Sequence, residues 1–501
     1  MTETIHSRRI LRNIIYGLST WIFPLFLGLI TTRVIVRSFG NTDYGIYALV
    51  LGFIGYSFNF SVGRAITKYL AAYRAAGETE KIQEIICATT VVAVGLAIVG
   101  SIIILSISKW LVVDIFSIEP ASQAKTVFAL QLSAATVFVL LLGQVGTSVL
   151  QGLHRFDILS RVQNLTSIFL MTGNLLLALK GFGLVALLLW TLAVMLVSSI
   201  GSLISARYLL VEFTFRFVLH GKILETVVRY SASIVLYQIL ANGFFIFERS
   251  LIVSRLGAET LTFYVIPMTL GMYMQGFVVS LCAFIFPLAS ELNTDRERLL
   301  VLYHGASKGV VTMVAILVAT LVTLGDPFLG LWLGADFAEH SADILVILVP
   351  AFGIAAATVI SYQTAEATGW PSFNLRNIVI GVLIASPLAV FLSATYGALG
   401  VAIGRVAFFS VSGVAIAFLE LRTFGNVQTA FWIGLLVRVG IAATAATVFE
   451  HVIMGAWGVS WLGLVVSGSS GLLVYGIILY ILGTVTSEDR RLLRRIVKRE
   501  A

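Results

Sequence analysis

Charged residues are scarce in this chain of 501 residues. Asp, Glu, Lys and Arg make up only 12% of it, whereas hydrophobic residues make up 58% and the mean hydropathy is +0.99. A soluble globular protein carries about 25% charged residues, so the composition excludes that class. Apolar runs of about 20 residues, long enough to cross a bilayer, recur from one end of the sequence to the other. The composition therefore predicts an all-α integral membrane protein.

Cysteine and catalytic motifs are also scarce. Cys87 and Cys282 both lie in apolar runs, so neither a disulfide framework nor a zinc site is predicted, and we expect no metal and no cofactor. No phosphate-binding loop of the Walker type occurs, so ATP is not expected to supply the energy directly. Paired acids and clustered histidines in a large outer loop, which a polysaccharide polymerase would need, are missing as well. These absences indicate a transporter rather than an enzyme.

Positive charge is in excess, with a net charge of +8. In a membrane protein basic residues collect in cytoplasmic loops and fix the orientation, so this excess does not indicate nucleic-acid binding. Most Lys and Arg fall in alternate loops, which places both termini in the cytoplasm. The opening residues lack a short apolar core followed by a small-residue cleavage site, so we expect the first apolar run to be a retained span.

The hydropathy pattern predicts about fourteen spans with short loops between them. Their expected limits are 13–36, 44–68, 85–107, 127–150, 158–179, 183–208, 227–253, 261–288, 302–325, 342–364, 374–395, 397–419, 429–450 and 460–483. After the last span, residues 486–501 alternate two basic with two apolar positions. Such a segment is typical of a helix that lies on the anionic inner leaflet, so anionic lipids are expected partners.

An internal repeat is visible at a spacing of 217 residues. The matching pairs are Gly40 with Gly257, Tyr47 with Tyr264, Gly152 with Gly369, Phe156 with Phe373, Asp157 with Asn374, and Gly183 with Gly400. The shift covers six spans, an even number, so the two halves are expected to be parallel repeats. The expected organisation is a six-helix lobe over 1–217, a second over 218–427, two extra helices over 428–485 and the basic tail over 486–501.

Cationic side chains at or within the spans are the candidate site residues, because charges in a membrane are costly and usually functional. Those expected to bind substrate are Arg33, Arg37, Arg64, Lys68, Arg249, Arg255 and Arg405. Glu248 and Glu366 are candidates for ion coupling or for pairing with these cations, and the role of Arg438 stays open. A single arginine could equally pair with a carboxylate or extend to the headgroups, but the acids are too few to explain the whole set.

A group of arginines suits a phosphate, which the planar guanidinium binds with two hydrogen bonds. Arg33 and Arg37 lie four residues apart, on one face of a helix, near the outer end of the first span, where basic residues are not favoured by topology. Moving an anion outward, away from a negative cytoplasm, gains about 2.3 kcal/mol per charge per 100 mV. The set therefore favours a lipid-linked pyrophosphate over a cationic drug as the substrate.

Five segments then carry a resemblance that covers nearly the whole chain. They are FGNTDYGIYAL, GRAITKYLA, LQGLHRFDILSRVQ, SRLGAETLTFYVI and FLGLWLGADFA. In this order they resemble the polysaccharide-export flippases of the multidrug/oligosaccharidyl-lipid/polysaccharide exporter superfamily. The resemblance implies a bacterial inner-membrane protein that flips an undecaprenyl-pyrophosphate-linked oligosaccharide by alternating access, for O-antigen or exopolysaccharide synthesis. It places the cationic lining on Arg33, Arg37 and Arg64, and other polysaccharide-assembly proteins become possible partners.

Two alternatives stay open at this point. A cation-coupled multidrug antiporter of the same superfamily would have about twelve spans and an ion-binding carboxylate within the bundles, often in the first span, where this chain has no acid. A membrane-embedded polysaccharide polymerase would need a sizeable outer loop, which the short connections do not provide. Proton, sodium and the membrane potential alone all stay open as sources of energy.

Overall fold

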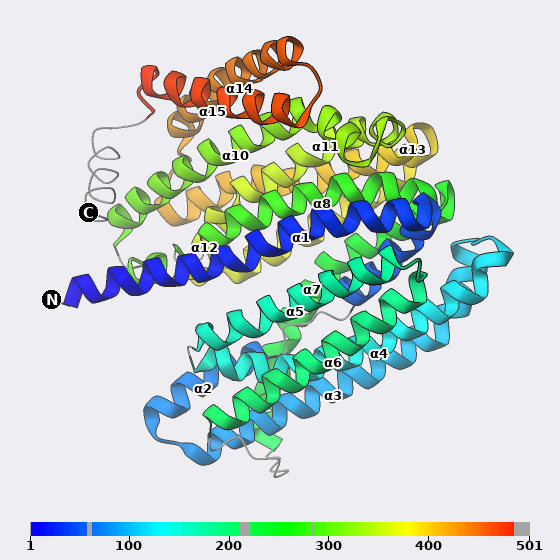
Figure 1. The fold of residues 1–501 in the computed structure, drawn as a ribbon. Helices are drawn as coiled ribbons and strands as arrows, with labels where there is room; N and C mark the ends of the chain where they lie inside the picture. Colours follow the sequence, from blue (N-terminus) through cyan, green and yellow to red (C-terminus); the bar gives the residue numbers. More distant parts are fainter. Residues whose placement is uncertain are drawn as a thin grey trace. The chain divides into compact units, whose positions relative to one another are not determined.

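The computed structural model describes residues 2–57, 63–153, 155–210, 221–282, 285–293 and 295–484, and these are almost entirely helical (Figure 1). No strand occurs within these ranges. The helices are α1 Thr2–Gly52, the π-helix η1 Phe53–Ser57, α2 Arg64–Ala76, α3 Thr79–Trp110, the π-helix η2 Leu111–Ile115, α4 Pro120–Gly152, α5 Phe156–Leu179, α6 Leu184–Leu209, α7 Gly221–Leu256, α8 Ala258–Leu281, α9 Ile285–Glu291, α10 Arg296–Leu333, α11 Ala335–Ala357, α12 Val359–Ala367, α13 Pro371–Phe424, α14 Thr429–Trp457 and α15 Trp461–Ile481.

The chain forms two compact units. The first unit comprises Met1–Val265 with Ser386–Val401, and the second unit comprises Ile266–Ala385 with Ala402–Ala501. These units are defined by packing rather than by the internal repeat, so the lobe boundaries expected from the sequence stay a prediction. The basic tail, residues 486–501, lies outside the described part of the chain.

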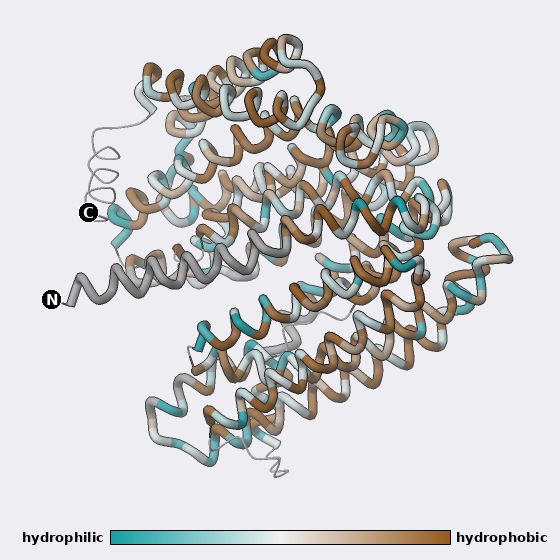
Figure 2. The backbone as a smooth tube through the Cα atoms, viewed as in Figure 1, coloured by the Kyte–Doolittle hydropathy of each residue, from teal (hydrophilic) through white to brown (hydrophobic). Residues whose placement is uncertain are grey.

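Within the described residues, ten helices are long and apolar enough to cross a membrane. Hydrophobic residues run along the lengths of the helices in each unit (Figure 2). Many of them are exposed, for example Val197 on α6, Val414 on α13 and Val465 on α15. So much exposed apolar surface suits contact with lipid and not with water. The prediction of an all-helical protein with many spans is confirmed.

Two of the assigned helices each contain a sharp break at a glycine. In α1 the break is at Gly40 (φ 76, ψ 170), between the predicted spans 13–36 and 44–68. In α13 it is at Gly397 (φ 58, ψ −134), the first residue of the predicted span 397–419, directly after the predicted span 374–395. Positive φ is readily adopted only by glycine, so these two residues allow one span to end and the next to begin without a loop.

The predicted span 44–68 is the main difference between the expected and observed helices. It is not one continuous helix, because α1 ends at Gly52, the π-helix η1 follows, and α2 starts only at Arg64. Hydrophobic residues are frequent through this stretch, so averaged hydropathy did not predict the break. A π-helical segment of this kind is often found at functional sites.

The 217-residue repeat is also visible in the local geometry. Gly257 has a positive φ of 89°, like Gly40, and a helical segment follows each of them. The start of α3 at Thr79 and the start of α10 at Arg296 are separated by the same interval. The repeated sequence therefore encodes repeated turn and helix positions as well as matching side chains.

Small residues set the close helix packing in both units. In the first unit, the hydroxyl of Ser202 on α6 donates to the carbonyl of Gly143 on α4 at 3.2 Å. In the second unit, α10, α14 and α15 pack against one another (Figure 1). Because lipid tails are as apolar as leucine, such contacts rely on small residues and on hydrogen bonds between helices.

Candidate arginine site and buried carboxyls

The sequence-predicted site residues are unevenly divided between the two units. Arg405, Glu366 and Arg438 belong to the second unit. The first unit holds the other cations and one acid: Arg33, Arg37, Arg64, Lys68, Arg249, Arg255 and Glu248. Any anion site made by several of these arginines would thus draw mainly on the first unit.

Arg33, which is half-buried, and Arg37, which is exposed, lie on one stripe of α1. The same helical face carries Phe26 and Ile30, whose side chains are 63% and 54% exposed. The buried face of α1 packs on α5, where the hydroxyl of Thr31 donates to the carbonyl of Met171 at 3.3 Å. No hydrogen bond or ion pair joins Arg33 or Arg37 to another residue of the described ranges. The stripe thus places two large apolar side chains next to two guanidinium groups.

Arg64 is exposed at the first position of α2. The preceding residue, Gly63, packs so closely on α4 that a Cβ atom there would collide with the Ser148 hydroxyl. On the same face the hydroxyl of Thr67 donates to the carbonyl of Ser148 at 3.2 Å. Lys68 also lies on α2, but its side chain is outside the part that the structure describes.

Arg249 and Glu248 are both buried on α7. A Cβ atom added to Gly52, the last residue of α1, would lie 2.7 Å from Cδ of Arg249. Glycine at this position therefore lets the arginine side chain lie directly against the α1 backbone. Both charged residues also take part in other interactions.

Arg255 and Glu366 have identified hydrogen-bond partners. Nη1 of Arg255 donates to the carbonyl of Val390 at 2.7 Å and to the hydroxyl of Ser393 at 2.9 Å, which ties the end of α7 to α13 within the first unit. The exposed Glu366 accepts from Nδ2 of Asn374 at 3.2 Å. These contacts explain both side chains without a substrate, although their predicted roles stay predictions.

Arg405 is completely buried in the second unit. The central carbon of its guanidinium lies 5.7 Å from the ring centre of Phe352, 5.8 Å from Phe408 and 5.6 Å from Phe409. Each ring face can attract the cation. By contrast, Arg438 is exposed on α14 among apolar residues, a position from which its side chain can extend toward headgroups.

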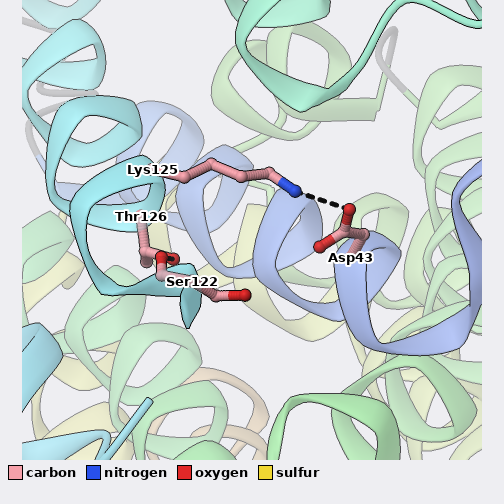
Figure 3. A network of polar contacts seen from close by, with 4 residues as sticks. All are labelled: Asp43, Ser122, Lys125 and Thr126. Carbon is pink, nitrogen blue, oxygen red and sulfur yellow. Dashed lines mark hydrogen bonds and ion pairs between the residues drawn. The ribbon is translucent and has the colours of Figure 1, made fainter. Parts of the chain in front are cut away.

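An ion pair joins the segment after Gly40 to α4. Nζ of Lys125 lies 2.5 Å from a carboxylate oxygen of Asp43, and both side chains are about one-third exposed. Figure 3 shows this pair beside Thr126, whose hydroxyl donates to the carbonyl of Ser122 at 2.8 Å. Asp43 belongs to the FGNTDYGIYAL segment. Its ion pair with Lys125 holds the helical segment after the Gly40 break against α4.

Two buried carboxyls of the second unit, Glu420 and Glu450, are not among the residues predicted from the sequence. Glu420 on α13 accepts hydrogen bonds from the Tyr303 hydroxyl, the Trp432 indole and the Gln428 backbone. Glu450 on α14 accepts one from the Thr320 hydroxyl at 2.7 Å. Glu450 is the last residue of the predicted span 429–450, so the rule that acids within spans are functional candidates could have identified it. Glu420 falls one residue beyond a predicted span and gave no such signal.

Comparison with known proteins gives matches to both sequence and fold. The model of a family described as polysaccharide biosynthesis protein matches residues 34–342, more than half of the chain. The chain is 21% identical over 410 residues to the "Putative O-antigen transporter" of Shigella flexneri, covering 79% of this chain and 93% of that protein.

Two solved structures share the fold. One is the lipid II flippase MurJ in an inward closed conformation, with a TM-score of 0.69, 13% identity, and coverage of 94% of this chain and 99% of that one. The other is a multidrug resistance MATE family transporter of the MOP superfamily in an inward-facing conformation, with a TM-score of 0.63 and 18% identity. That match covers 82% of this chain and 94% of the transporter. At these identities the likeness concerns the fold alone.

Proposed function

The chain belongs to the polysaccharide biosynthesis protein family, and from this premise we propose that it flips a lipid-linked oligosaccharide across the bacterial inner membrane. The substrate would be an oligosaccharide joined through pyrophosphate to undecaprenol, moved from the inner to the outer leaflet for O-antigen or exopolysaccharide synthesis. Alternating access would expose the substrate to one side at a time. In this proposal the protein performs no chemical reaction, and both termini lie in the cytoplasm.

The observation that carries the proposal is the stripe on α1. Phe26 and Ile30 are exposed on the same face as Arg33 and Arg37, so one helix face offers apolar contact followed by two guanidinium groups. A lipid pyrophosphate has the same order, with an apolar chain joined to a dianionic group. Guanidinium groups bind phosphate oxygens bidentately, and neither Arg33 nor Arg37 is held by a carboxylate of the described residues.

Arg64 extends the proposed cationic path. It is exposed at the start of α2, in a segment that the sequence analysis assigns to the inner end of a span. With Arg33 and Arg37 near the outer end of the first predicted span and Arg64 near the inner end of the second, the pyrophosphate could exchange one cationic partner for the next. Membrane potential could drive this movement outward, because an anion leaving a negative cytoplasm moves down the field.

A multidrug antiporter is the second candidate, and the fold likeness to a MATE family transporter favours it. Such a protein would take a cationic substrate, which suits acidic side chains. In the first unit the exposed stripe on α1 carries arginines and not acids. The charge of this stripe therefore supports the flippase over the antiporter.

The proposed function can be tested in a strain from which the gene is deleted. The strain should accumulate undecaprenyl-linked oligosaccharide on the inner leaflet and lose the surface polysaccharide, and the wild-type protein should restore export. Arg33→Ala produced at the wild-type level should fail to restore it, whereas Arg438→Ala serves as an arginine control and should restore it. Normal export in the deletion strain, or accumulation of a drug instead of the lipid, would refute the flippase and favour the antiporter.

A further inference from the structure

The carboxyl group of Glu450 is a buried titratable group that the proposed substrate path does not use. Its residue is 0% exposed, and it lies on α14 in the second unit. The hydroxyl of Thr320 on α10 donates to Oε1 at 2.7 Å. The other oxygen, Oε2, has no hydrogen-bond partner among the described residues. A fully buried carboxyl with only one of its oxygens bonded requires an explanation.

The third helix around this carboxyl is α15. A Cβ atom on Gly471 would collide with the Glu450 carboxyl, so the acid lies directly against the backbone of α15. Ser467 is one helical turn earlier on the same face, is fully buried, and has a hydroxyl with no partner within the described ranges. A Cβ atom added to Gly468 would lie 3.8 Å from the methyl group of Thr320. One carboxyl and two hydroxyls thus gather where α10, α14 and α15 meet.

Glu420 provides a direct comparison within the same unit. It is as deeply buried as Glu450, yet its carboxyl accepts hydrogen bonds from Tyr303, Gln428 and Trp432. Three donors stabilise the charged form of a carboxylate. Glu450 accepts a hydrogen bond from Thr320, whereas the nearby hydroxyl of Thr323 donates to the carbonyl of Ala319 at 2.8 Å. In an apolar contact between helices, an ionised group with so few hydrogen bonds is costly.

Hydroxyl groups are suitable partners for a carboxyl that gains and loses a proton. A threonine hydroxyl can donate to a carboxylate and can also accept from a carboxylic acid, so Thr320 can bond Glu450 in both protonation states. A metal cation would need several oxygen ligands around it, whereas the backbone at Gly471 closes directly on the carboxyl. The chemistry of this cluster therefore favours a proton over a metal ion.

Other titratable groups near the cluster are already engaged or face away. Tyr475, one turn beyond Gly471 on α15, donates its hydroxyl to the carbonyl of Thr312 at 2.7 Å. His451, next to Glu450 on α14, is exposed, as are Asp326 on α10 and Arg438 on α14. Within one turn of Thr320 on α10, every other side chain is uncharged. Glu450 is thus the titratable group that the three packed helices enclose.

We propose that Glu450 is a proton-binding site, with Thr320 as its hydrogen-bonded hydroxyl partner and the buried Ser467 hydroxyl one helical turn from Gly471 on α15. The proton comes from water and adds to a carboxylate oxygen, and no other bond forms or breaks. Loss of the proton would leave a carboxylate between the apolar surfaces of three helices, so protonation is coupled to the packing of α14 and α15 on α10. Only the use of this site in transport rests on the proposed function.

Infrared difference spectroscopy of the full-length protein in lipid nanodiscs tests the site. The wild type should show the carbonyl band of a buried carboxylic acid at neutral pH, and the band should shift in heavy water. Glu450→Gln should remove the band, whereas Glu366→Gln, which changes an exposed acid, should leave it. Thr320→Val should move the band by removing the hydrogen bond, and this variant decides the question if Glu450→Gln does not fold.

Three results would overturn the proposal: no acid band in the wild type at neutral pH, a band that is insensitive to both Glu450→Gln and Thr320→Val, or a band that sodium chloride removes at constant pH. The last result would assign the site to sodium. The measurement needs no lipid-linked substrate, so it can fail or succeed independently of the flippase assay. A strain that exports polysaccharide normally while the protein lacks the band would refute the proton site and leave the proposed function intact.

Discussion

The indole nitrogen of Trp432 donates a hydrogen bond to Oε1 of Glu420 at 2.6 Å, joining the start of α14 to the end of α13. The same oxygen accepts from the Tyr303 hydroxyl of α10 at 3.0 Å. Glu420 thus connects three helices of the second unit through a single buried carboxylate. Its contacts indicate a structural role and not a substrate-binding one.

Glu420→Gln should therefore destabilise the second unit. An amide replaces one acceptor oxygen by a donor, so at least one of its partners loses its acceptor, at about 1–3 kcal/mol for each unsatisfied buried group. Thermal unfolding in detergent should show a lower midpoint for this variant. Glu366→Gln is the control, because Glu366 is exposed and accepts one hydrogen bond. Equal midpoints for the two variants would contradict the structural role.

Arg33→Ala should weaken binding of the lipid-linked oligosaccharide by about ten- to a hundredfold. This is the effect of losing a hydrogen-bonded charge pair worth about 1.5–3 kcal/mol. Arg33→Lys should recover only part of the loss, because the ammonium keeps the charge but not the bidentate geometry. Arg37 is more exposed on the same stripe, so Arg37→Ala should have a smaller effect.

Binding of purified variants to the lipid-linked sugar in nanodiscs measures these differences, and membrane levels in cells control for folding. Arg255→Ala is a useful comparison, since Arg255 is already engaged with Val390 and Ser393 and should affect stability more than binding. Wild-type affinity for the double variant of Arg33 and Arg37 would show that these arginines only anchor the end of α1.

Gly63→Ala should displace α2, because the new Cβ atom would collide with Ser148 on α4. The change should lower the unfolding midpoint and also reduce export, since α2 carries Arg64. Ser148→Gly removes the colliding atoms, so the double variant should recover part of the lost stability. A double-mutant cycle measures this coupling. Additive effects would mean that the two residues do not pack as the structure shows.

The sequence predicted the fold well where the signal is local. Hydropathy located the helices, and the matched pair Gly40 and Gly257 marks two positions at which the backbone has positive φ. The break at η1 was not predicted, because residues 53–57, Phe-Ile-Gly-Tyr-Ser, carry no charge and follow directly on an apolar run. Composition therefore shows which segments enter the membrane. It does not show where the backbone hydrogen bonding changes from an α-helix to a π-helix.

The candidate site was less predictable than the fold. Spacing alone placed Arg33 and Arg37 on one face, which the exposed stripe of α1 supports. The hydrogen bond from Tyr303 to Glu420 could not be predicted, because Tyr303 is 117 residues away in sequence. The contacts of Arg405 depend equally on tertiary structure, since Phe352 lies on another helix. Depth within a predicted span identified Arg405 but could not identify the rings around it.

Arg405 gives the last prediction. The sequence predicts that this residue binds substrate. In the structure, however, its guanidinium carbon lies 5.6–5.8 Å from the centres of three phenyl rings, which favours a role in holding α11 and α13 together. Arg405→Lys keeps the charge but loses the planar group that stacks on rings, so we expect a lower unfolding midpoint with little change in substrate affinity. A desolvated cation–π contact contributes about 2 kcal/mol, and Phe409→Leu should weaken the fold in a way that is not additive with Arg405→Lys. If Arg405→Lys instead loses substrate binding while its unfolding midpoint is unchanged, Arg405 contacts the substrate, as the sequence predicts.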